Sequence, residues 1–229
     1  MPVLPFLLAY PGESGFSGGM TGPDFEIETE LFAQGYARIA GVDEVGRGPL
    51  AGPVTAAAVI LNPADIPDGL NDSKKLTARK RAVLETDILA RAHVAIAHAT
   101  VEEIDEHNIL RASHIAMQRA IAALDPAPDF LLIDGNLIPR GTALPARAVV
   151  KGDARSLSIA AASIVAKTCR DRIMVDLARQ HPGYGWDRNA GYPSKSHILA
   201  LRNLGVTPHH RRSFRPVHNI LYQVKSVSD

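Results

Sequence analysis

The segment at residues 39–53, IAGVDEVGRGPLAGP, constrains the fold more than any other part of the chain. An apolar run is followed directly by two carboxylates, Asp43 and Glu44, and then by a glycine-rich turn that carries one arginine. Packing favours apolar residues at the end of a buried strand, and two consecutive acids there must be solvated, paired or bound to a cation. The segment therefore predicts a strand whose end serves a purpose other than packing.

Periodic apolar segments along the rest of the chain predict an α/β fold. Strands are expected at residues 36–42, 54–61, 92–101, 130–135 and 146–153, with the first two antiparallel. Helices are expected at residues 24–34, 77–91, 102–124, 158–180 and 195–203. Thr77 is the expected N-cap of the second helix. In the third helix, the expected core stripe consists of Leu110, Met117, Ile121 and Leu124.

The chain divides into three parts by composition. Residues 12–22 are rich in glycine and serine, so residues 1–23 are expected to form a flexible N-terminal extension. The periodic segments lie in residues 24–181, which we expect to form the main domain. Residues 182–229 contain more turn-forming and polar residues, and we expect a small helical and loop-rich region there.

Charge and cysteine content limit the function classes. The net charge of +1 gives the whole molecule no basic field, so any nucleic-acid-binding surface must be local. The one cysteine, Cys169, excludes an internal disulfide framework and a cysteine-based zinc site, which fits a reducing cytoplasm. We expect its side chain to be buried. The apolar start of the chain lacks a preceding basic region and is too short to span a bilayer, so we expect neither a signal peptide nor a membrane anchor.

Three of the predicted strands end in acidic residues. Asp134 ends the strand at residues 130–135, and Asp153 ends the one at residues 146–153, as Asp43 and Glu44 end the first. If these strands end at one edge of the sheet, the four carboxylates converge. Clustered anions are usually compensated by a hard divalent cation, so the sequence predicts a Mg²⁺ or Mn²⁺ site. Two such ions about 4 Å apart can activate a water and stabilise the leaving oxygen in phosphodiester hydrolysis.

Each of these features also has a structural interpretation. A single Asp at a strand end is more often a turn former or helix N-cap than a metal ligand, and this applies to Asp134 and Asp153. Residues 71–81 carry five positive charges around Asp72, which is either a solvated helix start or an anion-binding segment. Cations are unfavourable at the N-terminal end of a helix dipole, and an anionic partner would relieve that conflict.

Five motifs, in order along the chain, resemble the ribonuclease HII family, which is the type 2 ribonuclease H family. They are DEVGRGPLAGP at 43–53, DSKKL at 72–76, IDGN at 133–136, KGD at 151–153 followed by SIAAASIVAK at 158–167, and GYP at 191–193. The resemblance covers about residues 25–217. It implies a ribonuclease H-like fold with a mixed central β-sheet flanked by helices and a small C-terminal helical region. It also implies metal-dependent endonucleolytic cleavage of RNA in RNA–DNA hybrids and at single ribonucleotides embedded in duplex DNA.

The resemblance assigns roles residue by residue. The catalytic, metal-binding acids are Asp43, Glu44, Asp134 and Asp153. The residues that contact substrate are Gly46, Arg47, Gly48 and Tyr192, to which we add Ser73, Lys74 and Lys75 as phosphate contacts. Recognition of a single 2′-hydroxyl requires close backbone approach, which glycines permit. The resemblance implies that Tyr192 packs against the sugar at the ribonucleotide-to-deoxyribonucleotide junction. Without the resemblance, an aromatic residue in a Gly/Pro turn would be interpreted as a packing residue. The basic cluster at residues 211–215 is a weaker phosphate-binding candidate.

These expectations combine into one function with two rivals. We expect a monomeric, cytoplasmic, Mg²⁺- or Mn²⁺-dependent endoribonuclease that cuts 5′ of a ribonucleotide, leaves 3′-OH and 5′-phosphate ends, and acts in DNA replication and repair. One rival is a type 2 relative restricted to longer hybrids, against which the joint presence of residues 46–48 and Tyr192 argues. The other rival is a non-catalytic hybrid-binding module, which the full set of four acids disfavours.

Overall fold

A mixed five-stranded sheet forms the centre of the molecule in the computed structural model, which describes residues 22–222. Most of the expected N-terminal extension lies outside this range. The strands are β1 (Ile39–Val45), β2 (Val54–Ile60), β3 (His93–Ala99), β4 (Phe130–Asp134) and β5 (Ala146–Val149), in the order β3-β2-β1-β4-β5. β2 is antiparallel to both β1 and β3, whereas β1, β4 and β5 run parallel. The predicted mixed sheet and the antiparallel first pair are confirmed.

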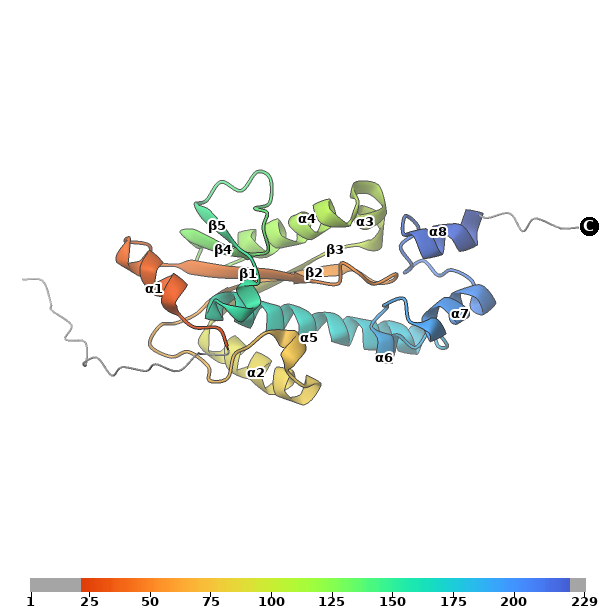
Figure 1. The fold of residues 1–229 in the computed structure, drawn as a ribbon, viewed down its shortest axis with the longest axis horizontal. Helices are drawn as coiled ribbons and strands as arrows, with labels where there is room; N and C mark the ends of the chain where they lie inside the picture. The colour runs from red at the N-terminus through yellow and green to blue at the C-terminus, as the bar shows by residue number, and fades with distance from the viewer. Residues whose placement is uncertain (1–21, 223–229) are drawn as a thin grey trace, which may run out of the picture.

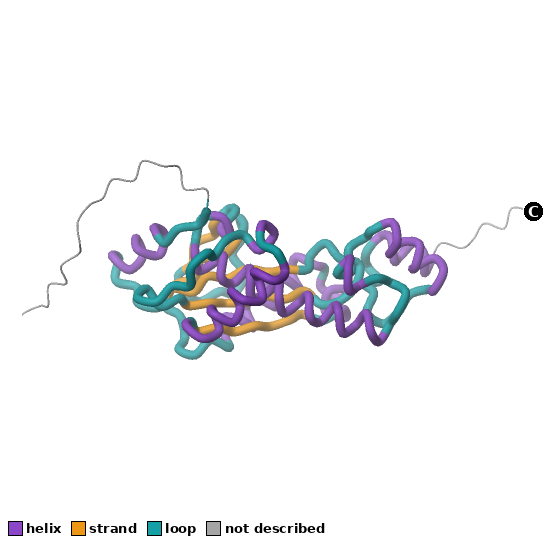
Figure 2. Tube along the Cα trace, turned by 90° about the horizontal axis from the view of Figure 1, so that it is seen from below, coloured by secondary structure: helices purple, strands orange, loops and turns teal. Residues whose placement is uncertain are grey.

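Helices cover both faces of this sheet (Figure 1). The helices are α1 (Glu26–Ala33), α2 (Ala78–Arg91), α3 (Val101–His107), α4 (Ile109–Ala122), α5 (Leu157–Gln180), α6 (Trp186–Asn189), α7 (Lys195–Leu204) and α8 (Arg215–Tyr222). α3 and α4 lie on one face, and α2 and α5 lie on the other. α6, α7 and α8 gather at one end of the molecule, beyond the strands (Figure 2). None of the helices in residues 22–222 is long and apolar enough to cross a membrane.

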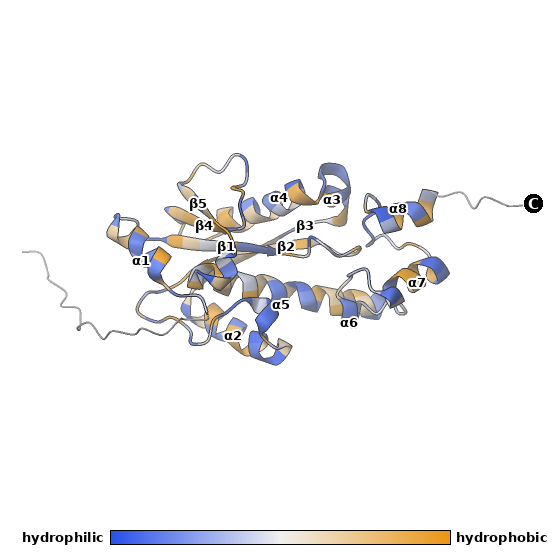
Figure 3. Ribbon diagram, in the orientation of Figure 1, coloured by the Kyte–Doolittle hydropathy of each residue, from blue (hydrophilic) through white to orange (hydrophobic). Residues whose placement is uncertain are grey.

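Two apolar layers hold the helices to the sheet. β2 is buried along its whole length because its alternating side chains face both layers. Most helices carry hydrophobic and hydrophilic residues in alternation, as expected when only one side is buried (Figure 3). α5 lies very close to β1, since a Cβ added at Gly41 would be 2.1 Å from the backbone carbon of Ser158. The small residues at the start of α5 thus pack directly on the sheet, as their sequence indicates.

The helix expected at residues 102–124 is two helices. Asn108 breaks it with φ of 68°, and its side-chain Oδ1 accepts hydrogen bonds from the backbone nitrogens of Leu110 and Arg111, which caps α4. The break changes which residues share a face. Met117 and Leu124 are buried as predicted, but Leu110 is 38 % exposed, so its assignment to the core was wrong.

Two further expectations need correction. β5 ends at Val149, so Asp153 does not end a strand but lies in the 3₁₀ turn Gly152–Ala154 (η2). Lys151, in the left-handed conformation with φ of 56°, redirects the chain between the two elements. Cys169 is only partly buried, because α5 extends beyond the edge of the sheet that covers its first half.

Candidate active site

Three carboxylates meet at the carboxyl ends of β1 and β4. Asp43 lies in β1, Asp134 ends β4, and Asp153 follows in η2. One oxygen of each lies within 4.8 Å of the others. The parallel pairing of β1 with β4 brings these strand ends to the same edge of the sheet. The convergence expected from the strand pattern is therefore present for these three acids, which form the acidic cluster (Asp43, Asp134 and Asp153).

The acidic cluster is poorly compensated by the protein itself. Burial, followed by the charges of Glu44 and Asp134, raises the pKa of Asp43 well above its ordinary value. Burial and the charge of Asp134 also raise the pKa of Asp153, although Lys74 opposes this. Three oxygen donors that repel one another in a buried position fit a hard divalent cation, which neutralises them and accepts carboxylate ligands. The chemistry of this donor set therefore agrees with Mg²⁺ or Mn²⁺.

Glu44 faces away from the acidic cluster. Successive side chains of a strand point to opposite faces, so Asp43 faces α5 while Glu44 faces α4. Its Oε1 lies 3.3 Å from Nη1 of Arg47. Burial raises the pKa of Glu44, and Arg47 opposes the shift. Glu44, Arg47 and Asp134 line one pocket of about 230 Å³, so the fourth acid is adjacent to the cluster without belonging to it.

The DSKKL segment reaches the acidic cluster through one of its lysines. Nζ of Lys74 lies 3.2 Å from Oδ2 of Asp153 and 3.9 Å from Oδ1 of Asp72. Lys75 is exposed. The side chain of Ser73 is buried, and its Oγ is 2.9 Å from Oγ of Ser163 on α5. The expectation that this hydroxyl holds a phosphate is therefore not supported, because it fastens the 3₁₀ turn Ser73–Lys75 (η1) to α5 instead.

The glycine-rich loop and the Gly-Tyr-Pro turn come together although they are far apart in the sequence. A Cβ added at Gly48 would be 3.2 Å from Cε1 of Tyr192, so the absence of a side chain lets the ring approach the loop. Gly46 adopts φ of 97°, and a Cβ there would be 2.2 Å from Nε of Arg170. The side chains of Arg47 and Tyr192 remain exposed on this surface. Predicted substrate-binding residues are thus assembled side by side.

Two fully buried arginines fix this loop. The guanidinium of Arg211 donates hydrogen bonds to the carbonyl oxygens of Gly46, Arg47, Pro49, Gly52 and Pro53. Arg170 donates to the carbonyl oxygens of Ala51, Pro53 and Ala190. Burial lowers the pKa of Arg211 to about 9 and that of Arg170 to about 10, so both stay charged at neutral pH. The interpretation of Arg211 as a surface phosphate contact was wrong, because its side chain is fully buried.

The burial of one of these two arginines could have been predicted from the sequence. Arg170 lies four residues from Ala166 and four from Met174, and all three are buried on α5. A charged residue that continues an apolar stripe indicates a buried role with fixed partners. Arg211 carried no such signal, since it lies in a run of basic residues.

Two buried histidines position the turn that carries Tyr192. The backbone nitrogen of Thr207 donates to Nδ1 of His210, so the proton of neutral His210 lies on Nε2, 3.1 Å from Nε2 of His197. The Nε1 of Trp186 also donates to Nε2 of His197 at 3.0 Å. His197 must then carry its proton on Nδ1, which donates to the carbonyl oxygen of Tyr192 at 2.9 Å. The turn is thus connected by hydrogen bonds to the C-terminal helical region.

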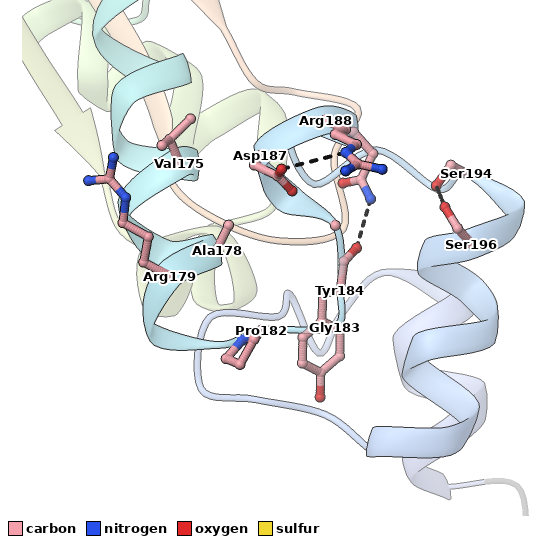
Figure 4. Close-up of a pocket in the computed structure, with 12 residues that line it drawn as sticks. Val175, Ala178, Arg179, Pro182, Gly183, Tyr184, Asp187, Arg188, Ser194 and Ser196 are labelled. Atoms are coloured by element: carbon pink, nitrogen blue, oxygen red, sulfur yellow. Dashed lines mark hydrogen bonds and ion pairs between the residues drawn. The ribbon is translucent and has the colours of Figure 1, made fainter.

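A separate pocket of about 690 Å³ lies between the end of α5, α6 and the start of α7 (Figure 4). Tyr184 and Arg179 are among the residues that line it, and no member of the acidic cluster does. The loop at residues 46–53 and Tyr192 are also absent from its lining. Its size therefore does not identify it as the site of chemistry.

A family profile, curated sequences and a solved structure that resemble this chain all come from one group of ribonucleases. The sequence profile of the ribonuclease HII family matches residues 40–217. The ribonuclease HII of Ruegeria sp. (strain TM1040) is 74 % identical over 210 residues, which cover 92 % of both chains. The ribonuclease HII of Ruegeria pomeroyi is 71 % identical over 220 residues, covering 96 % of this chain and 94 % of that one. The crystal structure of ribonuclease H2 from Pyrococcus horikoshii OT3 is similar with a TM-score of 0.69 and 26 % identity, covering 80 % of this chain and 97 % of that one.

Proposed function

Because the chain belongs to the ribonuclease HII family and is an endoribonuclease, we propose that it nicks duplex DNA at single embedded ribonucleotides as well as cutting the RNA strand of RNA–DNA hybrids. Cleavage is on the 5′ side of the ribonucleotide and leaves 3′-OH and 5′-phosphate ends. The observation that carries this proposal is the close approach of Tyr192 to Gly48, in the loop whose Arg47 lines one pocket with Asp134 of the acidic cluster. This arrangement supports a loop that would read one sugar close to the groups that would hold the metal.

The acids provide the metal-binding part of the proposed mechanism. Asp43, Asp134 and Asp153 would hold Mg²⁺ or Mn²⁺ through oxygen ligands, and Glu44, which shares a pocket with Asp134, would contribute from the opposite face of β1. When bound, the metal lowers the pKa of a water and stabilises negative charge on the reacting phosphate. Without it, the raised pKa values of Asp43 and Asp153 disfavour the full negative charge of the cluster. Metal binding and ionisation of the acids are therefore coupled.

The chain's own residues would bind and orient the nucleic acid. The backbone at Gly46 and Gly48 permits close approach to the sugar whose 2′-hydroxyl is read. The exposed guanidinium of Arg47 can donate to a phosphate oxygen beside that sugar. The exposed ring of Tyr192 would contact the following deoxyribose, where a 2′-hydroxyl would clash. The exposed Lys75 adds a phosphate contact without sequence preference.

The cellular setting belongs to the same proposal. We propose that the protein is a monomer that works in the cytoplasm and removes misincorporated ribonucleotides during DNA replication and repair. The single cysteine of the sequence agrees with a reducing compartment, because it allows no internal disulfide. The partners are RNA–DNA hybrids and duplex DNA that contains ribonucleotides.

A substrate comparison tests the proposal. The purified full chain is incubated with Mg²⁺ or Mn²⁺ and one of three duplexes: DNA with one ribonucleotide, a continuous RNA–DNA hybrid, or DNA alone. We expect a single nick 5′ of the ribonucleotide, cleavage of the hybrid, and no reaction with DNA. Cleavage of the hybrid alone would favour a relative restricted to longer hybrids. Binding without cleavage of either substrate would favour a non-catalytic hybrid-binding module.

A further inference from the structure

A groove of about 320 Å³ lies between α4 and the loop that joins β4 to β5. Three large apolar side chains in its lining face solvent: Leu110 is 38 % exposed, Leu137 48 % and Ile138 41 %. Apolar residues exposed singly are common, whereas a group of them with polar residues around it is typical of a binding surface. No step of the proposed cleavage uses these three side chains, so their exposure calls for another explanation.

Hydrogen bonds hold the loop side of this groove in position. Nε2 of Gln118 on α4 donates to the carbonyl oxygen of Arg140 at 2.7 Å. The hydroxyl of Thr142 donates to the carbonyl oxygen of Pro139, also at 2.7 Å. The first bond links the loop to α4 across the groove, and the second closes the turn behind it. The groove is therefore formed before any ligand binds.

The rim of the groove is cationic. Arg111 on α4 and Arg140 on the loop are exposed, and neither forms an ion pair with another residue between 22 and 222. His114 lies in the same lining, and burial together with the charges of Arg47, Arg111 and Arg140 lowers its pKa. Three guanidinium groups thus act on one imidazole from different elements. Arg47 is paired with Glu44, but the charges of Arg111 and Arg140 are uncompensated and favour an anionic ligand.

The groove is continuous with the active site. Leu110, His114 and Leu137 also line the pocket of about 230 Å³ that contains Arg47 and Asp134. A chain molecule whose phosphate lies at the acidic cluster would therefore extend directly into the groove. Lys74 approaches the acidic cluster from the opposite face of the sheet, on the side of α5.

We propose that this groove binds a nucleotide of the substrate next to the cleavage site, with its phosphate on Arg111 and Arg140 and its sugar or base edge on Leu110, Leu137 and Ile138. A nucleotide has both components that the groove offers to bind, an anionic group and an apolar edge. The inference rests on the proposed function, because it extends the binding site for the same substrate. A protein segment would meet the apolar floor but would not need the two unpaired arginines.

The salt dependence of duplex binding tests whether Arg111 and Arg140 at the rim of the groove contact a phosphate. Binding of a fluorescent duplex with one ribonucleotide is measured by anisotropy in EDTA, which prevents cleavage, over a range of KCl concentrations. Each phosphate contact that is lost lowers the slope of log Kd against log salt by about 0.9. Because both arginines bind the same phosphate, we expect the double variant Arg111→Gln/Arg140→Gln to lower the slope by about 0.9 and to raise Kd roughly tenfold at moderate salt. The variant Arg111→Lys/Arg140→Lys keeps both charges and should recover most of the slope.

Two further variants distinguish an effect of the groove on binding from an effect of net charge or of misfolding. Arg147→Gln removes one arginine whose charge is already compensated, since Arg147 pairs with Glu30 at 3.3 Å, and it should leave slope and Kd unchanged. Leu137→Glu changes an exposed side chain, so it should fold normally, and it should weaken binding because it puts a negative charge on the apolar floor. In steady-state cleavage with Mg²⁺, the glutamine double variant should raise KM and leave kcat within twofold, since the groove touches no reacting atom.

The outcomes distinguish failure of this inference from failure of the proposed function. If the wild-type chain nicks the single-ribonucleotide duplex but the glutamine double variant keeps the wild-type slope and Kd, the groove inference alone is wrong. It is also wrong if Arg147→Gln has an equal effect, because the loss would then reflect net charge. If the wild-type chain neither binds nor cuts that duplex, the proposed function fails and the inference fails with it.

Discussion

Nζ of Lys74 lies 3.2 Å from Oδ2 of Asp153, so a lysine partly neutralises the carboxylates that would hold a metal ion. The lysine is largely exposed, whereas the aspartate is buried. Because the ammonium group lies on the solvent side, a divalent cation can displace it without any change in the fold. The acidic cluster can therefore be folded in the absence of metal and still be available to it.

Removal of this lysine should strengthen metal binding. In Lys74→Ala the divalent cation no longer competes with the ammonium group, so we expect its Kd to fall roughly threefold, in keeping with the weak energetics of exposed ion pairs. Isothermal titration calorimetry with Mn²⁺ in the absence of substrate measures this. Lys75→Ala, which removes the neighbouring exposed lysine, is the matched control and should have little effect. An unchanged or higher Kd in Lys74→Ala would show that the two cations do not compete.

Asp134→Asn should abolish cleavage while leaving substrate binding largely intact. The amide removes the negative charge that makes this oxygen a strong metal ligand, and we expect cleavage to fall by roughly a thousandfold or more. Single-turnover cleavage and anisotropy measure the two properties separately. Asp176→Asn, which changes an exposed carboxylate on α5, should cleave normally. Survival of cleavage in Asp134→Asn would mean that the metal site is assigned to the wrong residues.

Arg47→Ala should weaken substrate selection more than metal binding. The side chain lies on the loop surface and touches Glu44 rather than the acidic cluster, so we expect KM to rise about tenfold and the Kd for metal to change less than twofold. Arg188→Ala provides a control, since that side chain is highly exposed in the C-terminal region. An equal loss of substrate and metal binding would contradict the assignment of substrate binding to the loop and of metal binding to the acidic cluster.

Arg211→Ala should destabilise the fold rather than remove a phosphate contact. Five carbonyl oxygens lose a buried donor, and we expect a cost of about 3–5 kcal/mol in the free energy of unfolding. Urea denaturation monitored by circular dichroism measures this loss. Arg212→Ala removes the adjacent side chain, which is exposed, and should change stability by less than about 0.5 kcal/mol. Equal stabilities for the two variants would contradict the role assigned to Arg211.

Stability should fall as the pH is lowered below about 6.5, the ordinary pKa of histidine in an unfolded chain. Burial and the neighbouring His197 lower the pKa of His210 to about 3, and burial also lowers that of His197. Between about pH 3 and 6.5 the unfolded chain binds more protons than the folded one, so stability rises with pH there. The contribution is complete above that window and is lost as the pH falls through it. A second proton on either ring would set two N–H groups against each other.

Urea unfolding at pH 7, 6 and 5 measures this dependence, with an expected slope of up to about 1.4 kcal/mol per pH unit for each proton taken up. His210→Asn should reduce the slope because one buried titrating group is gone. His93→Asn, which changes an exposed histidine on β3, should leave the slope unchanged. An equal slope in the wild-type chain and in His210→Asn would mean that the ring of His210 is not buried in its neutral form.

The secondary structure was predictable where the local signals agreed. Thr77 caps α2 through a hydrogen bond from the backbone nitrogen of Lys80, as expected from its position before a helical pattern. The helix at residues 158–180 corresponds to α5 almost residue for residue. The break at Asn108 was missed because apolar spacing continues through it, and only the backbone conformation of one residue separates α3 from α4.

The acidic cluster was largely predictable, but its surroundings were not. The ends of the predicted strands show which acids can converge. Asp43 and Glu44 point to opposite faces of the sheet, and which helix covers each face is known only from the fold. The burial of Arg211 had no local signal, because its partners are backbone carbonyls more than 150 residues away. Charged residues are almost never fully buried, so exposure was the better expectation without the fold.

The hydrogen bonds between Arg211 and the loop at residues 46–53 also set an order of assembly. The loop is synthesised early, but the side chain that holds its carbonyl groups leaves the ribosome more than 150 residues later. All three acids of the cluster are present in the nascent chain well before that residue. A growing chain can thus contain the whole acidic cluster while the loop at residues 46–53 still lacks the arginine that holds it. The loop at residues 46–53 can form these hydrogen bonds only after residue 211 has been synthesised.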